Sequence, residues 1–343
     1  MTPMQQMFLG LGAAPGPNIT DLFSADTWSG NSSNRSITTG LDMSGDGGFV
    51  WIKRTDGSEK HYLASTDTGT SIILHPNETY GPENNTDSVT SFNNNGFSLG
   101  ADSSGTRNGC VNTSGRSYVG WSFKEHDKFM KIVTWTGNGN GSGQTITHGL
   151  GTTPAFIIAR AYSQGGGWYV YHKEMGNSQY LRLNSANARG YDSQWGVGAT
   201  TFNASQAQTE LNDNGQSYFA MVFGDESDGG TFGSTGDKKG IVVGHYTGNG
   251  NNNGPTVTLG FKPGFLMIKR KDGTGKWMIY DYVRGLNYPT SGYNQTIECP
   301  GETGQTAEDR FEVSNTGFQI THWNDAFNAS GEKYVYMALP IST

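Results

Sequence analysis

A segment of roughly a hundred residues recurs three times along this chain of 343 residues, and this repeat limits the folds available to it. The clearest copy opens with Tyr-Thr-Gly-Asn-Gly at 246–250, and another opens with Trp-Thr-Gly-Asn-Gly at 135–139. The same short runs follow in the same order, at 255–258, 260–264, 265–270 and 277–280, and at 144–147, 149–154, 156–160 and 168–171. A more diverged copy starts with Trp-Ser-Gly-Asn at 28–31 and continues through 35–38, 40–41 and 49–54. The chain is therefore predicted to fold as three similar units.

Each copy also closes in the same way, with a Gly-containing turn followed by a strand rich in aromatic residues. The three closing segments are 114–123, 214–223 and 330–339. We therefore place the units at 20–125, 126–235 and 236–343, after an N-terminal arm at 1–19. The segment 124–128 is a short charged connection, whereas 225–236 is acidic and Gly-rich and predicts a flexible linker.

The composition indicates that the units are built from strands. The chain has 51 Gly, 12% aromatic and only 15% charged residues, as many short strands joined by tight turns require. Short runs with a period of two, such as 49–53 and 61–64, lie between Gly, Asn and Asp turn signals. No stretch carries a helical pattern over three turns. We predict an all-β fold of three tandem, jelly-roll-like β-sandwich units behind a short arm.

Charge and hydropathy exclude two classes of partner. A net charge of −7 and a pI of about 5.5, without any basic run, argue against nucleic acid and against an anionic membrane surface. No run approaches the length of a membrane span, so no membrane insertion is expected. The N-terminal segment 1–17 lacks a basic region, so we interpret it as a tether rather than a signal peptide.

No metal, cofactor or catalytic motif is recognisable. The seven His residues are scattered, and the two Cys residues, Cys110 and Cys299, lie in different units as expected free thiols. The acidic segment 42–48 resembles a calcium loop only faintly, and we interpret it as a turn. Carboxylates such as Glu174, Asp281 and Asp325 give no reason to pair any two of them as a glycosidase requires. We expect no enzymatic activity and no cofactor.

Aromatic residues divide into predicted core positions and candidate contact residues. Six Trp residues recur in the repeat or alternate with apolar neighbours, and we assign them to the core: Trp28, Trp51, Trp121, Trp135, Trp168 and Trp277. Four aromatic residues lie instead in the diverged middles of the units: Tyr80, Tyr191, Trp195 and Trp323. These four are the candidates for stacking on a glycan or another receptor.

The repeat resembles one found in virion structural proteins of marine tailed phages, cyanophages among them. The resemblance rests on residues 246–250, 260–269 and 334–338, on Trp277, and on Asp281 with Arg284 and Gly285. The second unit lacks the Arg-Gly step, and the first lacks the complete opening and the Pro before its strand at 49–53. In that family the unit looks like part of tail fibres, appendages and other surface components.

The resemblance implies a non-enzymatic structural protein on the surface of a phage particle. We expect a tail- or fibre-type appendage or adhesin that contacts the host surface. A capsid decoration protein and a free carbohydrate-binding, lectin-like protein are the alternatives. The expected partners are other virion proteins, a host-surface glycan and further copies of the chain in a homotrimer. Apolar residues of the arm are the expected virion anchor: Met4, Met7, Phe8 and Leu9.

Overall fold

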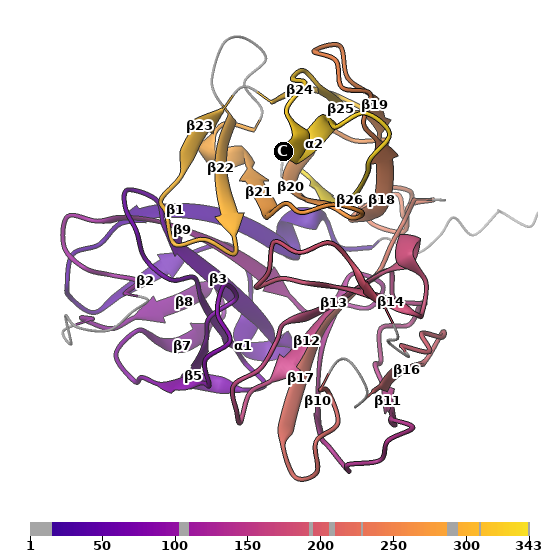
Figure 1. Ribbon diagram of the computed structural model, residues 1–343. Helices are drawn as coiled ribbons and strands as arrows, with labels where there is room; N and C mark the ends of the chain where they lie inside the picture. Colours follow the sequence, from indigo (N-terminus) through magenta and orange to yellow (C-terminus); the bar gives the residue numbers. More distant parts are fainter. Residues whose placement is uncertain are drawn as a thin grey trace, which may run out of the picture.

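The computed structural model describes residues 16–102, 110–191, 195–205, 210–227, 229–286, 294–308 and 310–341. Over these residues the chain is all-β, with six antiparallel sheets arranged as three pairs (Figure 1). Each pair consists of a six-stranded sheet and a smaller sheet of two or three strands. The prediction of an all-β fold with three β-sandwich units is confirmed.

The large sheets have equivalent strand orders in the three units. In unit 1 the order is β1 (Phe23–Ser29), β9 (Ser117–Lys124), β3 (Gly48–Arg54), β4 (Tyr62–Ser65), β5 (Gly69–Leu74) and β6 (Glu83–Asn84). In unit 2 it is β10 (Met130–Thr136), β17 (Ser217–Phe223), β12 (Phe156–Ala161), β13 (Tyr169–His172), β14 (Gln179–Arg182) and β15 (Gly190–Tyr191). In unit 3 it is β18 (Val242–Thr247), β26 (Lys333–Pro340), β20 (Pro263–Arg270), β21 (Trp277–Asp281), β22 (Asn294–Cys299) and β23 (Thr306–Glu308).

The small sheets and short helices complete the units. The small sheets are β2 (Arg35–Thr38), β8 (Gly96–Leu99) and β7 (Val89–Asn93), then β11 (Gln144–Thr147) and β16 (Thr201–Ala204), then β19 (Thr256–Thr258), β25 (Gly317–Ile320) and β24 (Phe311–Ser314). The helices are η1 (Ile19–Asp21), α1 (Met43–Asp46), η2 (Lys173–Met175), η3 (Tyr282–Arg284) and α2 (Asp325–Asn328). Within the described part of the chain, no helix has the length and apolar character needed to cross a membrane.

The first and last strands of each unit pair with each other, which explains why the copies share their beginnings and ends. An aromatic residue of the first strand lies opposite a Tyr of the last strand in every unit. The pairs are Trp28 with Tyr118, Trp135 with Tyr218 and Tyr246 with Tyr334. Their rings are stacked, with centroids 5.8, 5.4 and 5.1 Å apart. This contact fixes the register that places the rest of each sheet.

Both faces of each large sheet are buried. In β20, Leu266 and Ile268 point into the core of their own sandwich, whereas Phe265 and Met267 belong to a core shared by all three units. The central strands are therefore continuous apolar runs rather than alternating ones, as in sheets covered on both sides. The period-two interpretation of 49–53 was too simple for this reason, because Phe49 to Lys53 are all buried.

The shared core makes the three sandwiches one packed body. Phe123 of unit 1 lies 5.7 Å from Phe223 of unit 2 and 5.9 Å from Phe265 of unit 3, measured between ring centroids. Phe156 and Trp277 make a similar contact between units 2 and 3 at 5.9 Å. In Figure 1 the three units, coloured indigo to purple, magenta and orange to yellow, surround this centre. The large sheets thus face each other in a ring.

The connection between units 2 and 3 is packed rather than flexible, so the linker prediction was wrong. Phe232 is buried in the shared core, where its ring lies 6.3 Å from that of Phe129. Glu226 accepts a hydrogen bond from the Gly240 backbone at 2.6 Å, and its own N–H donates to Ile241 at 2.9 Å. The Gly-rich composition allowed these turns to close tightly.

Candidate binding sites at the unit boundaries

One hydrogen bond is repeated at every boundary between units. At the start of β4, β13 and β21, a ring N–H donates to a backbone carbonyl of the preceding unit, and unit 3 precedes unit 1. The bonds run from Trp168 Nε1 to His75 O at 2.8 Å, from Trp277 Nε1 to Arg182 O at 2.9 Å, and from His61 Nε2 to Glu298 O at 3.2 Å. His61 is the neutral Nε2–H tautomer, because its Nδ1 accepts from the Trp51 indole at 2.9 Å. Burial holds the pKa of His61 well below its usual range.

A buried cation repeats the same relationship one strand away. Lys53, Arg160 and Lys269 occupy equivalent positions near the ends of β3, β12 and β20 and are almost fully buried. Their side chains donate to loop carbonyls of the preceding unit, namely Glu302 O at 2.9 Å, Tyr80 O at 2.8 Å and Asn187 O at 3.0 Å. Because all three bonds point the same way around the molecule, the units form a closed ring.

Burial also affects the acidity of these cations. It lowers the pKa of Lys269 to about 7, that of Lys53 to about 8 and that of Arg160 to about 10. Carbonyl oxygens satisfy the donors without neutralising the charge, so each cation retains a desolvation cost. The sequence analysis missed these residues, although they stand at the same place in the three aligned strands.

The boundary between units 3 and 1, which we call the seam, has an additional polar contact. These two units are not consecutive in the chain. Asp281 of unit 3 is buried, pairs with Arg284 at 2.6 Å and accepts the indole N–H of Trp121 from unit 1 at 2.8 Å. The equivalent positions in units 1 and 2 hold Ser65 and His172, each opposite the Phe that begins the central pairing. The buried ion pair therefore distinguishes the seam from the other two boundaries.

Three of the four predicted contact aromatics are exposed, but they lie in separate places. Tyr80 is 60% exposed, with the Lys60 ammonium 4.5 Å from its ring centroid. Tyr191, 54% exposed, lies beside the Arg189 guanidinium at 5.4 Å. Trp323, 57% exposed, stacks on His322 in the loop before α2. Each belongs to a different unit, so they do not form one stacking platform.

Trp195 does not belong to the exposed set. It is 1% exposed, and its ring packs 5.8 Å from that of Tyr171 in the core of unit 2. Its backbone N–H donates to Asn177 O at 3.1 Å and its carbonyl accepts from Asn203 N at 2.6 Å. These bonds hold the segment against the sandwich, so Trp195 fills the core and is no glycan contact in this structure.

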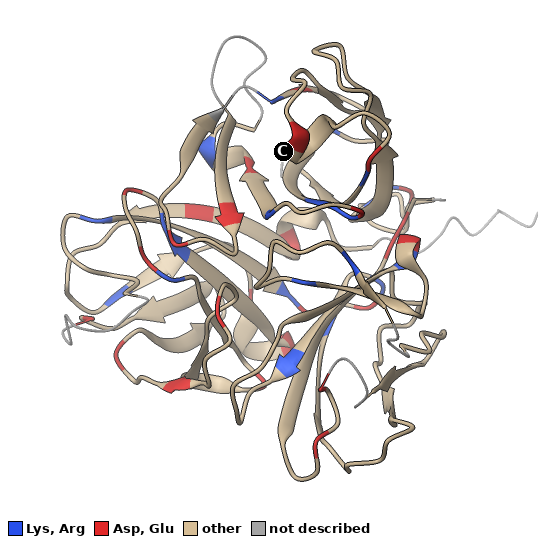
Figure 2. Ribbon diagram, in the orientation of Figure 1, with Lys and Arg blue, Asp and Glu red and all other residues tan. Residues whose placement is uncertain are grey.

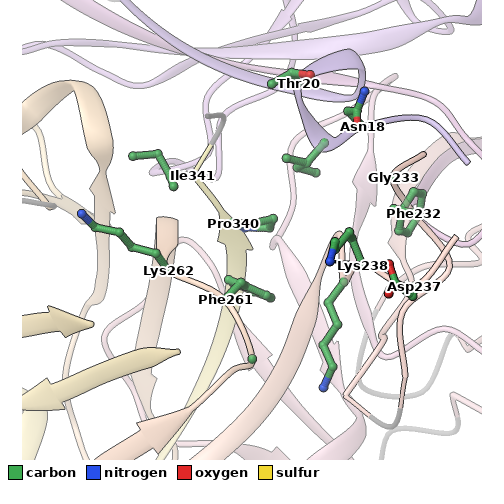
Figure 3. Close-up of a pocket in the computed structure, with 13 residues that line it drawn as sticks. Asn18, Thr20, Phe232, Gly233, Asp237, Lys238, Phe261, Lys262, Pro340 and Ile341 are labelled. Atoms are coloured by element: carbon green, nitrogen blue, oxygen red, sulfur yellow. Dashed lines mark ion pairs between the residues drawn. The ribbon is translucent and has the colours of Figure 1, made fainter. Parts of the chain in front are cut away.

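The anchoring residues predicted in the arm, Met4, Met7, Phe8 and Leu9, lie outside the described residues. The root of the arm is described and is tied to the connection between units 2 and 3. Gly16 N donates to Gly233 O at 3.0 Å, and Gly233 N donates to Pro17 O at 2.9 Å. Figure 3 shows the pocket beside this root, where Asn18, Phe232, Lys262 and Ile341 converge. The pocket has a volume of 610 Å³ and brings both ends of the described chain together.

The remaining candidates for chemistry are dispersed or have structural partners. Glu174 pairs with His245 at 2.8 Å, Asp281 is buried at the seam, and Asp325 begins α2 in unit 3. The segment at 42–48 forms α1, with Asp42 accepting from Gly45 N at its start. Within the described ranges, no three His, Cys, Asp or Glu residues form a group that could hold a metal ion. Figure 2 shows acidic and basic residues interspersed over all three units.

Comparisons with known proteins identify the family of the chain. A protein-family model matches residues 18–340, which include all three units. Its description is "Domain of unknown function (DUF7483)". A search of curated proteins and a search of solved structures each found no match. A single family model over all three units agrees with the shared core.

Proposed function

This chain belongs to the family described as Domain of unknown function (DUF7483), and we propose that it is a non-enzymatic structural protein of a phage particle. In this proposal it is a tail- or fibre-type appendage that contacts the host surface. The repeat motifs, which resemble those of phage virion proteins, support the phage context. The family description states no activity, so the architecture carries the rest of the argument.

The observation that carries the proposal is the closed ring of three similar but unequal sandwiches. Each boundary repeats a buried cation and a ring N–H that bind carbonyls of the neighbouring unit. Such a body is a rigid scaffold, whereas its loops carry different side chains in each unit, as Tyr80 and Tyr191 illustrate. Variable loops on a fixed scaffold are how recognition surfaces are commonly built.

The position of the arm supports attachment to a larger assembly. The root at Gly16 and Pro17 is bonded to Gly233, so a load on residues 1–15 would pass directly into the packed body. The apolar residues of the arm supply a contact for another virion protein in this proposal. The arm anchors the chain, and the loops of the ring face the host.

The ring itself favours a second candidate, a capsid decoration protein. Three similar units around one centre match a threefold position on a symmetric shell. Immunogold labelling of purified particles with antibodies against the chain distinguishes the two. The appendage proposal expects gold at the tail, and gold distributed over the head would favour decoration. Particles that contain the intact chain by mass spectrometry in neither place, or not at all, would contradict both.

A further inference from the structure

A second pocket, which we call the seam pocket, opens where unit 3 meets unit 1. It has a volume of 410 Å³. The lining residues from unit 1 are Thr27, Trp28, Ser29, Thr55, Ser117 and Tyr118, and those from unit 3 are Val283, Arg284 and Gln305. Four of these nine residues carry aliphatic hydroxyl groups. Its walls are fixed by bonds across the seam, from Gln305 N to Thr55 O at 2.9 Å and from the Tyr282 hydroxyl to Ala25 O at 3.2 Å.

Two polar atoms of the lining residues have no hydrogen-bond partner among the described residues. Arg284 is 7% exposed, and its Nε and Nη2 atoms are used by Asp281, at 2.7 and 2.6 Å. Its Nη1 atom is shielded from solvent and unpartnered, and so is Oε1 of Gln305. A buried N–H or carbonyl without a partner costs free energy, so native proteins almost always supply one.

The chemistry of these two atoms defines what would complete them. Arg284 Nη1 donates only, and Gln305 Oε1 accepts only. A hydroxyl group accepts from the first and donates to the second. Because Asp281 already neutralises the Arg284 guanidinium, the pocket does not call for an anion.

The equivalent positions at the other boundaries lack this chemistry. Thr55 follows Arg54, which lies opposite Tyr118, and the same register places Tyr162 in unit 2 and Lys271 in unit 3. The Tyr162 ring packs edge-on to Phe219, with centroids 6.4 Å apart. At the boundary between units 2 and 3, Glu174 and His245 form an ion pair instead. The hydroxyl-rich pocket is therefore a property of the seam and not a consequence of the repeated fold.

We propose that the seam pocket binds a neutral hexose unit of a glycan. The volume lies within the usual range of about 300–1,000 Å³ for small-molecule sites. The Thr and Ser hydroxyls donate to and accept from sugar hydroxyls, while Arg284 and Gln305 share one of them. Val283, 37% exposed at the pocket, offers an apolar surface to the sugar ring. This inference deepens the proposed function, and it rests on that function only for the host as the source of the glycan.

The test is binding of simple sugars to the purified full chain by saturation-transfer NMR. The probes are D-glucose, D-galactose, D-mannose and N-acetyl-D-glucosamine, with D-glucuronate as the acidic comparison. We expect saturation transfer to at least one neutral sugar and a weaker signal from glucuronate. Absence of transfer to every neutral probe, or a preference for glucuronate, would overturn the proposal.

Two variants locate the site without touching the Asp281–Arg284 pair. Gln305→Leu removes the unpartnered acceptor, and Val283→Trp fills the pocket. Each is expected to weaken binding about tenfold while leaving the melting temperature near that of the wild type. Tyr80→Ala and Trp323→Ala, at exposed aromatics elsewhere, are matched controls and should bind normally. If both pocket variants bind like the wild type, or both controls lose binding, the site is wrong.

A crystal soaked with the bound sugar provides a second measurement. A sugar hydroxyl between Arg284 Nη1 and Gln305 Oε1 is expected, and a water molecule alone in that position would overturn the proposal. These experiments use the isolated protein, so their failure leaves the immunogold result unaffected. Conversely, sugar binding would persist even if the chain were absent from the tail.

Discussion

The indole of Trp121 and the carboxylate of Asp281 join the first and third units by a buried hydrogen bond of 2.8 Å. The same carboxylate is held by Arg284, whose guanidinium lies 5.5 Å from the Trp121 ring centroid. No linker crosses this boundary, so the contact contributes to closing the ring in the absence of a direct covalent connection. Its burial makes each partner sensitive to loss of the other.

Replacing Asp281 by Asn is predicted to destabilise the protein by about 3–5 kcal/mol, because it leaves the buried charge of Arg284 uncompensated. Urea denaturation followed by tryptophan fluorescence measures this change. Asp325→Asn, an exposed carboxylate in the same unit, is the control and should change the free energy of unfolding by less than about 1 kcal/mol. Equal effects of the two substitutions would contradict the role of the pair.

The buried Lys269 predicts a pH dependence. Burial lowers its pKa to about 7, whereas an unfolded Lys titrates near 10.4. Between these values the unfolded state binds more protons, so this residue makes the protein more stable as pH rises from about 7 to 10. Lys269→Met should therefore reduce the slope of unfolding free energy against pH by up to about 1.4 kcal/mol per pH unit. Urea titrations at several pH values test this, and an unchanged slope would show that the ammonium is not desolvated.

Glu125, in the connection between units 1 and 2, predicts the opposite dependence. Burial, with the nearby charge of Asp67, raises its pKa to about 7. The folded state then binds more protons than the unfolded state between about pH 4.5 and 7, so stability falls as pH rises through that window. Glu125→Gln should raise the melting temperature at pH 8 and have little effect at pH 4. A lower melting temperature at pH 8 would mean that the charged carboxylate is stabilising.

The two Trp residues predicted as contacts should behave differently from each other. Trp195→Ala removes a ring from the core of unit 2 and should cost about 3–5 kcal/mol, as large-to-small core substitutions do. Trp323→Ala, at an exposed ring, should cost less than about 1 kcal/mol. Chemical denaturation of both variants decides the matter. A similar small cost for both would return Trp195 to the surface.

The sequence predicted the local part of this architecture well. The repeated openings and closings indicated three sandwiches, because first and last strands pair within each unit, as Trp135 and Tyr218 do. The shared core was not predictable, since Phe265 and Leu266 are equally apolar and nothing local distinguishes which face covers which partner. Exposure of Trp195 was misjudged for a related reason, because its burial depends on bonds to Asn177 and Asn203 that are distant in sequence.

The seam pocket illustrates the same limit at the level of the site. Thr55 and Gln305 lie in different units and meet only because the ring closes. The positions of Lys53, Arg160 and Lys269 were visible in the aligned repeat, yet a charged residue near the end of a strand ordinarily indicates exposure. Only the arrangement of the units reveals that these cations are buried against a neighbour.

Differential scanning calorimetry of the full chain tests most directly the claim that the three units form one closed body. A shared core that includes Phe123, Phe223 and Phe265 predicts a single transition, in which the calorimetric and van't Hoff enthalpies agree. Asp281→Asn should move that whole transition to lower temperature. Separate transitions, with one unit unfolding while the others remain folded, would contradict the account.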